Sequence, residues 1–545
     1  MQKDTQLSGR IVRAGIAVAV GHLLFKLAGL IQVAVMGRVL PKDVYDATYG
    51  FAFENCIFML FLVGQEIIGP TLMPLFMREL NSEEGERSAW SLVHALFRFQ
   101  GIILLLVMAV LMLFPGWFVE RLTMWSPTER PEIFEMARSS LASLAPALLG
   151  LSFATTSYVI LNAYKRFFLA ALADAVWKFA VVIGLLVGLA LAPQQIRWYL
   201  TGSLLVGSLL KFATHLAGLR DKAALLRLRP DLRHPALRDL GRLMLPLIVG
   251  ILFAKWRDIF NNTYILSGLE EAGLIQANSM GRKLNGTIAM LIPYTLAIAM
   301  FPFLCELVDR DDRQALGDLL TRSGRMLVSI LLPFACVVAV IAPPLTALLF
   351  GGGHFDDTAV ARTAISMACY TFALPAIAVE MLMMQAFFAN RRTLSVALTG
   401  IIFSAVSIAV SYYTIVVLKW QGGQALAAVA GGLTLSRWLK TTTLAVLLRR
   451  NAPLFPLWPT MGFLLRTLLM SLAAAGAAWL GIYALDRLAV PVQGIVSLVL
   501  RLGVAGIAAA IGFVAGCFIF GVREPREMLR WTIARAKGQP PPTTL

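Results

Sequence analysis

The fold is decided by a stretch that begins at Leu243 and ends at Glu306 and reads LMLPLIVGILFAKWRDIFNNTYILSGLEEAGLIQANSMGRKLNGTIAMLIPYTLAIAMFPFLCE. It consists of two apolar spans joined by a short acidic link. The ionisable residues inside these spans are Lys255, Arg257, Asp258, Arg282 and Lys283. A charge within a membrane-spanning helix is costly unless it faces water or a partner, so it marks a functional site by default. The stretch therefore predicts a polar, cationic chamber at membrane depth.

The composition extends this interpretation to the whole chain. Of its 545 residues, 58% are hydrophobic and only 14% are charged, whereas about 25% are charged in a typical soluble domain. Apolar runs of about 20 residues, the length that crosses a hydrocarbon core of about 30 Å, recur from one end to the other. The sequence predicts an all-α polytopic membrane protein with about fourteen transmembrane helices.

Basic residues set the orientation of these helices. Lys and Arg gather in every second connecting loop, above all in 220–242 and in the tail from Arg523 to Lys537. Short loops rich in Lys and Arg stay in the cytoplasm, so both termini are predicted to be cytoplasmic. These loops also account for the net charge of +17, and no nucleic-acid partner is expected.

Weak internal similarity predicts a duplication. The segment Pro74–Leu80 resembles Pro302–Leu307, and Asn162–Phe167 resembles Phe388–Thr393. The two offsets agree (302 − 74 = 228 and 391 − 165 = 226), and each match falls at the cytoplasmic end of a span. Two copies of six spans share one orientation, so a pseudo-twofold axis along the membrane normal relates them.

The expected domains follow from the duplication. An N-terminal six-helix lobe (1–219) precedes a basic cytoplasmic linker (220–242) and a C-terminal six-helix lobe (243–450). The last two spans (451–522) lie outside the duplication, and a cytoplasmic tail (523–545) ends the chain.

The offset also aligns charges in the first two spans of each lobe. Lys26 corresponds closely to Lys255, and Glu54 corresponds to Arg282 because 282 − 54 = 228. The pseudo-axis turns these helices toward one another, so the four side chains are predicted to share a cavity at the repeat interface, where such transporters bind substrates. Lys26, Lys255, Arg257 and Arg282 are the candidate substrate ligands.

A second set of charges consists of candidates for gating or coupling: Glu54, Asp46, Arg38, Glu66 and Asp258. Arg38 and Asp46 lie near the periplasmic end of their spans, where they would form an external gate. Glu54 and Glu66 are candidates for binding a coupling proton or cation, since burial makes a carboxylate hold its proton more tightly. Simple ion pairing is the alternative for both, and Asp258 has the further alternative of neutralising its sequence neighbour.

Other polar residues favour structural roles or stay open. Asp174 and Lys178 are one helical turn apart and are predicted to pair within their helix. Glu380 lies alone in its span, and a functional role for it is left open. The five cysteines have no metal-like spacing, so no metal site is expected. The five histidines are scattered and no phosphate-binding loop is present, which argues against an enzyme and against catalytic residues.

Several motifs then occur in an order known from one transporter family. They are Phe25–Gly29 followed by Gly37 and Arg38, Asn162–Leu172, Asn278–Leu284, Ala342–Asp356, and Leu374–Thr393. Together they resemble the MurJ/MviN family of lipid II flippases, within the multidrug/oligosaccharidyl-lipid/polysaccharide exporter superfamily. The order and spacing of the motifs, rather than any single one, carry the resemblance over about residues 10–450.

The resemblance implies two six-helix lobes around a cationic cavity, and a groove for a polyprenyl tail formed by the last two spans. It implies a flippase of the bacterial cytoplasmic (inner) membrane that moves lipid II, an undecaprenyl-diphosphate-linked cell-wall precursor, to the periplasmic leaflet by alternating access for peptidoglycan biosynthesis. No cofactor is expected, and the membrane potential or an ion gradient is expected to drive transport. The expected partners are the polyprenyl-diphosphate-linked glycan and membrane lipids; a monomer is expected, and a cell-wall or polysaccharide synthase partner is left open.

The substrate-binding arginines of the family carry over only in part. Arg282 matches one of them, and Lys26 replaces another with the same charge. Gln32, Leu60 and Phe61 stand where the family usually has arginines. A flippase for another polyprenyl-linked glycan, of exopolysaccharide or O-antigen type, therefore stays an alternative, as does a drug/cation antiporter of the same superfamily.

Overall fold

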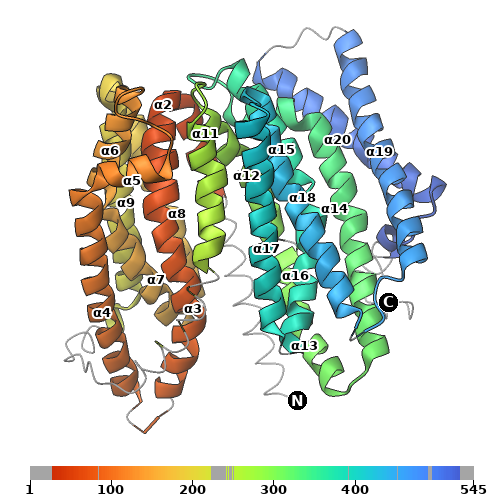
Figure 1. Ribbon diagram of the computed structural model, residues 1–545, viewed down its shortest axis with the longest axis horizontal. Coiled ribbons are helices and arrows are strands. Elements are labelled where there is room, and N and C mark those ends of the chain that lie inside the picture. Colours follow the sequence, from red (N-terminus) through yellow and green to blue (C-terminus); the bar gives the residue numbers. More distant parts are fainter. Residues whose placement is uncertain are drawn as a thin grey trace. The chain divides into compact units, whose positions relative to one another are not determined.

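The computed structural model describes residues 27–527 except 81, 84, 223–240, 242–243, 245–247, 249–250, 292, 391, 451 and 489–493. All regular secondary structure in these residues is helical (Figure 1). They form two compact units. The first unit comprises the described residues up to Gln276 together with Gly353–Phe355, and the second comprises those of Ala277–Gly352 and from Asp356 onward.

Many of the helices are long enough to cross a membrane. Over the described ranges, nine are sufficiently long and apolar, or ten if the bent pair α6 (Pro131–Leu144) and α7 (Ala147–Ala163) counts as one span. A helix suits this solvent because it satisfies its own backbone hydrogen bonds. The all-α polytopic membrane fold is thus confirmed. The predicted count of fourteen spans is not tested, because several predicted spans run over residues outside the description.

The first unit begins with a helix over Leu27–Val39. It continues through α2 (Lys42–Val44), η1 (Tyr45–Ile57), α3 (Phe58–Leu80), α4 (Glu86–Leu113), α5 (Pro115–Leu122), α6 (Pro131–Leu144), α7 (Ala147–Ala163), α8 (Phe167–Leu191), η2 (Pro193–Gln195), α9 (Ile196–Gly218) and η3 (Arg220–Lys222). After the linker come helical residues 251–259, η5 (Phe260–Tyr264), α11 (Ile265–Ser267) and the start of α12 (Leu274–Leu291).

The segment η1 is a π-helix of 13 residues inside the continuous helix Lys42–Leu80. Most π-helical segments are single-turn bulges, and they occur frequently at functional sites. Twelve of the residues of η1 are buried, and Glu54 is the exception. Most side chains of this segment are therefore enclosed by protein, and the Glu54 carboxylate is partly accessible.

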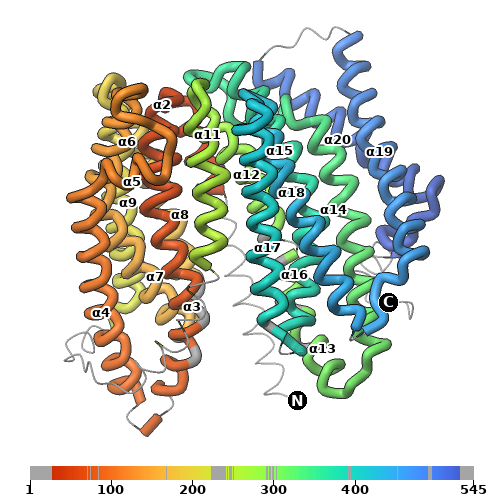
Figure 2. Tube along the Cα trace, in the orientation of Figure 1, coloured from red at the N-terminus to blue at the C-terminus, as the bar shows by residue number. Residues whose placement is uncertain are grey.

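In the interior of the first unit, helices α7, α8 and α9 pack closely against one another (Figure 2). A Cβ atom on Gly150 of α7 would come within 2.8 Å of the Ser208 backbone on α9, and one on Gly207 of α9 would come within 2.9 Å of the Trp177 carbonyl oxygen on α8. Small residues let membrane helices approach in this way. The side chains of α9 that face α7 and α8 are consequently enclosed by protein.

The second unit contains the rest of α12 and eight longer elements with one π-helical turn. These are α13 (Pro293–Asp309), α14 (Arg313–Phe350), α15 (Asp357–Thr371), α16 (Leu374–Ala389), α17 (Thr393–Tyr412), η6 (Tyr413–Val417), α18 (Gly422–Leu448), α19 (Leu457–Arg487) and α20 (Ile495–Ile519). Carboxylates cap two of them. Asp312 accepts a hydrogen bond from the Ala315 amide at 3.0 Å, and Asp356 accepts one from the Ala359 amide at 2.8 Å.

An apolar core fills the second unit between α14, α16 and α18, with Leu331, Leu382 and Leu444 fully enclosed. The last helices, α19 and α20, pack against each other and against α14 (Figure 1). Their outer faces expose large apolar side chains such as Trp458 and Leu480, as expected for helices that contact lipid. The predicted groove for a polyprenyl tail in this region stays a prediction, as do the predicted domain boundaries.

Candidate functional site

Two of the predicted site residues meet in the first unit. Lys255, in the helical residues 251–259, places its Nζ 2.6 Å from Oε1 of Glu66 on α3. The lysine is partly buried, whereas Glu66 is exposed. A candidate substrate ligand thus has a candidate coupling carboxylate as its counter-ion. An anionic substrate that binds Lys255 would compete with Glu66 for the ammonium group.

Arg257 and Asp258 also form an ion pair. Nη2 of Arg257 lies 2.6 Å from Oδ1 of Asp258, and Nε donates to the same oxygen at 3.1 Å. Both side chains are partly buried. This geometry fits the alternative in which the two neighbours neutralise one another, and a substrate-binding role for Arg257 stays a prediction.

Asp46 has a partner that the sequence did not reveal. Its buried carboxylate accepts hydrogen bonds from the backbone amides of Gly273, at 2.9 Å, and Gln276, at 2.8 Å. These amides lie at the N-terminus of α12, where a helix has unpaired donors and a favourable dipole for an anion. The two amides lie 227 and 230 positions after Asp46 in the sequence, so no local capping motif predicts these hydrogen bonds. Asp46 thereby fixes the start of the helix that carries Arg282.

The other predicted gate and ligand residues are distributed over the chain. The backbone oxygen of Arg38 accepts a hydrogen bond from the His354 amide at 3.0 Å, and the gate between Arg38 and Asp46 stays a prediction. Glu54 is half-buried on η1, and Arg282 is half-buried on α12 in the second unit. The shared cavity with Lys26 and Lys255 is not tested, because Lys26 lies outside the described residues and the others are divided between the two units.

The region around Arg282 is held by polar contacts within the second unit. Asn278, one turn before Arg282 on α12, is buried and accepts a hydrogen bond from the Tyr370 hydroxyl at 2.9 Å. The Ser366 hydroxyl lies 3.4 Å from the same oxygen. Both partners belong to α15, so α12 is fastened to α15 beside the candidate ligand.

A cavity of about 470 Å³ opens between α3 and α7 in the first unit. Its lining is Gln65, Gly69, Met73, Thr155, Tyr158, Val159 and Asn162. Amide and hydroxyl groups can donate and accept hydrogen bonds at once, which suits sugar hydroxyls and peptide groups. The lining is mainly apolar, and Gln65, Thr155, Tyr158 and Asn162 are its hydrogen-bonding residues.

A second cavity of the first unit, about 400 Å³ in volume, has an acidic lining that includes Asp43, Glu129, Glu132 and Glu270. Arg130 closes one side by donating to the carbonyl oxygen of Leu269 at 2.7 Å. Across the part of the chain that the structure covers, no group of three or more His, Cys, Asp or Glu side chains is arranged to hold a metal ion.

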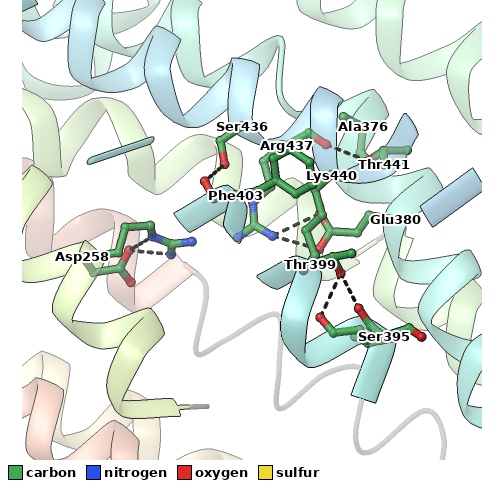
Figure 3. Close-up of polar contacts among 12 residues, drawn as sticks. Asp258, Ala376, Glu380, Ser395, Thr399, Phe403, Ser436, Arg437, Lys440 and Thr441 are labelled. Atoms are coloured by element: carbon green, nitrogen blue, oxygen red, sulfur yellow. Dashed lines mark hydrogen bonds and ion pairs between the residues drawn. The ribbon is translucent and has the colours of Figure 1, made fainter. Parts of the chain in front are cut away.

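The second unit contains a charge cluster that the sequence analysis missed. Glu380 of α16 is buried and receives Nη1 of Arg437 at 3.0 and 3.1 Å from its two oxygens, and Nζ of Lys440 at 2.7 Å (Figure 3). Glu380 is the one charged residue of α16, and its cationic partners come from α18. Arg437 and Lys440 are the charged residues of α18, and their position inside an apolar run was a signal that could have identified them.

A comparable pair lies inside the first unit and corrects another prediction. Asp174 of α8 pairs with Lys211 of α9, whose Nζ is 2.7 Å away, rather than with Lys178 of its own helix. The same Nζ lies 4.6 Å from the ring centroid of Phe61. Close packing of α8 on α9 explains the outcome, because it brings Lys211 to the carboxylate from the neighbouring helix.

At the ends of α7 and α9, an exposed pair contrasts with these buried ones. Arg166 binds both oxygens of Asp221 through Nη1 and Nη2, at 2.5 and 2.6 Å. This hydrogen bonding lowers the pKa of the Asp221 carboxyl from 3.8 to about 2. The pair lies outside the membrane-spanning helices, at the entrance to the basic linker.

Comparison with known proteins shows which family this chain resembles over most of its length. A family model described as lipid II flippase MurJ matches residues 36–493. A lipid II flippase MurJ of Burkholderia cenocepacia is 24% identical over 387 residues, which cover 70% of this chain and 74% of the relative. A probable lipid II flippase MurJ of Rhizobium tropici is 23% identical over 516 residues, which cover 94% of this chain and 93% of the relative.

Solved structures share the fold. A lipid II flippase MurJ in an inward closed conformation matches with a TM-score of 0.72 at 16% identity, over 94% of this chain and all of that one. An inward-facing multidrug resistance transporter of the MATE family, from the MOP superfamily, matches with a TM-score of 0.62 at 13% identity, over 80% of this chain and 97% of that one. At these identities the likeness concerns the fold alone.

Proposed function

Because the chain belongs to the MurJ family of lipid II flippases, we propose that it moves lipid II from the cytoplasmic to the periplasmic leaflet by alternating access, for peptidoglycan biosynthesis. The members of this family are transporters, so the protein is a transporter rather than an enzyme. It is a multi-pass protein of the bacterial inner membrane. The match of the family model over residues 36–493 carries the proposal. The charged residues at membrane depth supply its chemistry.

The head group of lipid II contains a diphosphate, whose negative charge cannot enter hydrocarbon without compensation. Arg282 provides a planar guanidinium that can bind two phosphate oxygens at once, and Lys255 provides a compact positive charge. Lys26 is the third proposed ligand. The contact of 2.6 Å between Lys255 and Glu66 is the proposed exchange step, in which phosphate replaces Glu66 on Lys255.

Charged groups inside the membrane also offer a means of driving the cycle. A charge that crosses the membrane field changes its energy by about 2.3 kcal/mol per 100 mV. We propose that the membrane potential or an ion gradient returns the empty cationic site, with Glu54 and Glu66 as the candidates for coupling. Arg38 and Asp46 are the proposed external gate, and the capping of α12 by Asp46 links this gate to the helix of Arg282.

A second candidate cargo is another undecaprenyl-diphosphate-linked glycan. It is favoured by two α3 positions at which the family resemblance expects arginines. Leu60 is exposed there without a charge, and Phe61 is buried beneath the ammonium group of Lys211. The diphosphate chemistry is the same for both cargoes, so the difference lies in recognition of the glycan. A monomer that works beside a cell-wall or polysaccharide synthase is proposed for either cargo.

Complementation tests the proposal in cells depleted of their own lipid II flippase. Wild type should restore growth, and Arg282→Ala, present in the membrane at the same level, should not. Arg282→Lys is the matched control, which keeps the charge but not the planar fork, and should restore growth in part. A correctly inserted wild type that fails to restore growth would exclude lipid II and favour the second cargo. Growth with both wild type and Arg282→Ala would remove Arg282 from the site.

A further inference from the structure

The two buried lysines occupy corresponding positions in the internal repeat. Lys440 follows Lys211 by 440 − 211 = 229 residues, beside the offsets of 228 and 226 that relate the repeated motifs. One lysine lies on α9 and the other on α18. Each places its Nζ 2.7 Å from a carboxylate oxygen. The carboxylates come from helices that do not correspond, because Asp174 lies on α8, directly before α9, whereas Glu380 lies on α16, two helices before α18.

The two clusters differ in the number of cations that contact the carboxylate. In the first unit Lys211 contacts Asp174. In the second unit Arg437 and Lys440 both contact Glu380. A buried ion keeps its place only if it is paired or faces water. Lys440 can therefore keep Glu380 paired when Arg437 leaves it.

Arg437 is the most exposed member of the cluster. The side chain of Glu380 is 4% exposed, that of Lys440 11% and that of Arg437 25%. On α18 the residues two positions away on either side, Leu435 and Leu439, are 47% and 40% exposed. Two residues correspond to a rotation of about 200° around a helix. Arg437 thus lies on the opposite side of α18 from its lipid-type face, where its accessible part can meet water or a polar ligand.

We propose that Arg437 is a further binding group for the diphosphate of the transported lipid, and that Glu380 holds it in place until the diphosphate arrives. A guanidinium binds phosphate oxygens in the same forked manner as carboxylate oxygens. Lys440 stays on Glu380 at 2.7 Å and keeps the carboxylate neutralised when Arg437 turns to phosphate. The inference rests on the proposed transport of a polyprenyl diphosphate, and it extends that function to a residue of α18.

A purely structural role makes different predictions. If Arg437 only supported the packing of α16 and α18, any substitution in the cluster would leave ligand affinity unchanged or weaken it. If Glu380 instead competes with the ligand for Arg437, removal of the carboxylate charge should tighten binding. The sign of the effect of Glu380→Gln therefore separates the two roles.

The test is equilibrium binding of undecaprenyl diphosphate to the full-length protein in lipid nanodiscs, with uncharged undecaprenol as the reference ligand. Arg437→Ala should weaken diphosphate binding about 10–100-fold, the range for a charge-assisted hydrogen-bonded contact, and should leave undecaprenol binding unchanged. Glu380→Gln should bind the diphosphate more tightly than wild type. An Arg437→Ala protein that binds within twofold of wild type would overturn the inference.

A double variant distinguishes ligand exchange from a long-range effect of charge. The pair Arg437→Ala with Glu380→Gln has the same net charge as wild type, because it removes one positive and one negative charge. Ligand exchange predicts that this protein binds like Arg437→Ala, whereas long-range charge predicts that it binds like wild type and would contradict the inference. Double-mutant cycles isolate such a coupling. If Arg437→Ala does not fold, Arg437→Lys takes its place in both comparisons.

Two further outcomes have distinct meanings. The control Lys211→Met with Asp174→Asn removes the corresponding pair of the first unit without changing its charge, and should leave diphosphate affinity unchanged. Weakening equal to that of Arg437→Ala would show a general packing effect and overturn the inference. A wild type that binds no undecaprenyl diphosphate would overturn the proposed function itself. Normal wild-type binding with an unaffected Arg437→Ala would overturn the inference alone.

Discussion

The two units place a lysine at corresponding positions of their last repeated helix but surround it differently. Lys211 is closed in by Asp174 and by the ring of Phe61, with 7% of its side chain exposed. Lys440 shares Glu380 with Arg437, which is 25% exposed. A buried ion pair alone is weak evidence for stability or function. The two units therefore differ in the number of cations on the buried carboxylate and in the exposure of those cations.

The largest effect is expected from breaking the closed pair of the first unit. Lys211→Met leaves Asp174 buried without a cation and should lower the free energy of unfolding by about 3–5 kcal/mol, as for other buried pairs that lose one partner. Chemical unfolding in detergent micelles measures the change. The matched control is Lys211→Met with Asp174→Asn, which removes both charges and should regain most of the loss. Equal stability of the single and double variants would contradict the view that Asp174 needs Lys211 as its counter-ion.

The second unit should tolerate the corresponding change better. Lys440 continues to neutralise Glu380 in Arg437→Ala, so the free energy of unfolding should fall by about 1–3 kcal/mol, the range for loss of a charged hydrogen bond. The same unfolding measurement applies, with Leu439→Ala on the exposed face of α18 as the control for truncation. A loss as large as that of Lys211→Met would show that the cluster of the second unit is as closed as that of the first.

An anion that is bound by backbone amides provides a third case. Asp46→Ala removes the carboxylate at the N-terminus of α12 and should cost about 0.5–2 kcal/mol, the usual range for an N-terminal cap. Asp46→Asn keeps one accepting oxygen and should cost less. Thermal unfolding of the two variants beside wild type measures both. If Asp46→Asn is as damaging as Asp46→Ala, the negative charge rather than the hydrogen bonding is what α12 requires.

The smallest effect is expected at the exposed pair of Arg166 and Asp221. Folding lowers the pKa of this carboxyl from 3.8 to about 2, so its contribution is present above pH 3.8 and disappears as the pH falls through about 2. The difference in Tm between wild type and Asp221→Asn should stay constant from about pH 8 to pH 5 and shrink only in stronger acid. A difference that already disappears near pH 5 would contradict the assigned pKa.

The fold class followed from the sequence because it depends on composition and on the length of apolar runs. The family followed from the order of motifs such as Asn278–Leu284 and Leu374–Thr393, and the family match over residues 36–493 confirms it. These features are spread over the whole chain. They can be recognised even where a single position, such as Leu60, departs from the family pattern.

The contacts of the site depended on packing and were harder to predict. Asp46 binds amides 227 and 230 residues away, a distance at which no local motif operates. The predicted partner of Asp174 was wrong, because spacing along a single helix does not show how closely α9 approaches α8. Arg437 and Lys440 were visible as charges inside an apolar run, but the sequence did not show that both contact Glu380.

The central claim is that cations inside the membrane carry a diphosphate-linked lipid to the outer leaflet. It is tested most directly in cells that depend on this protein, by adding from outside an enzyme that cleaves lipid II and measuring the fraction cleaved. The account predicts cleavage with wild type and with the control Lys211→Met plus Asp174→Asn, and protection of lipid II with Arg282→Ala and Arg437→Ala at equal protein levels. Protection with wild type, or full cleavage with both arginine variants, would contradict it.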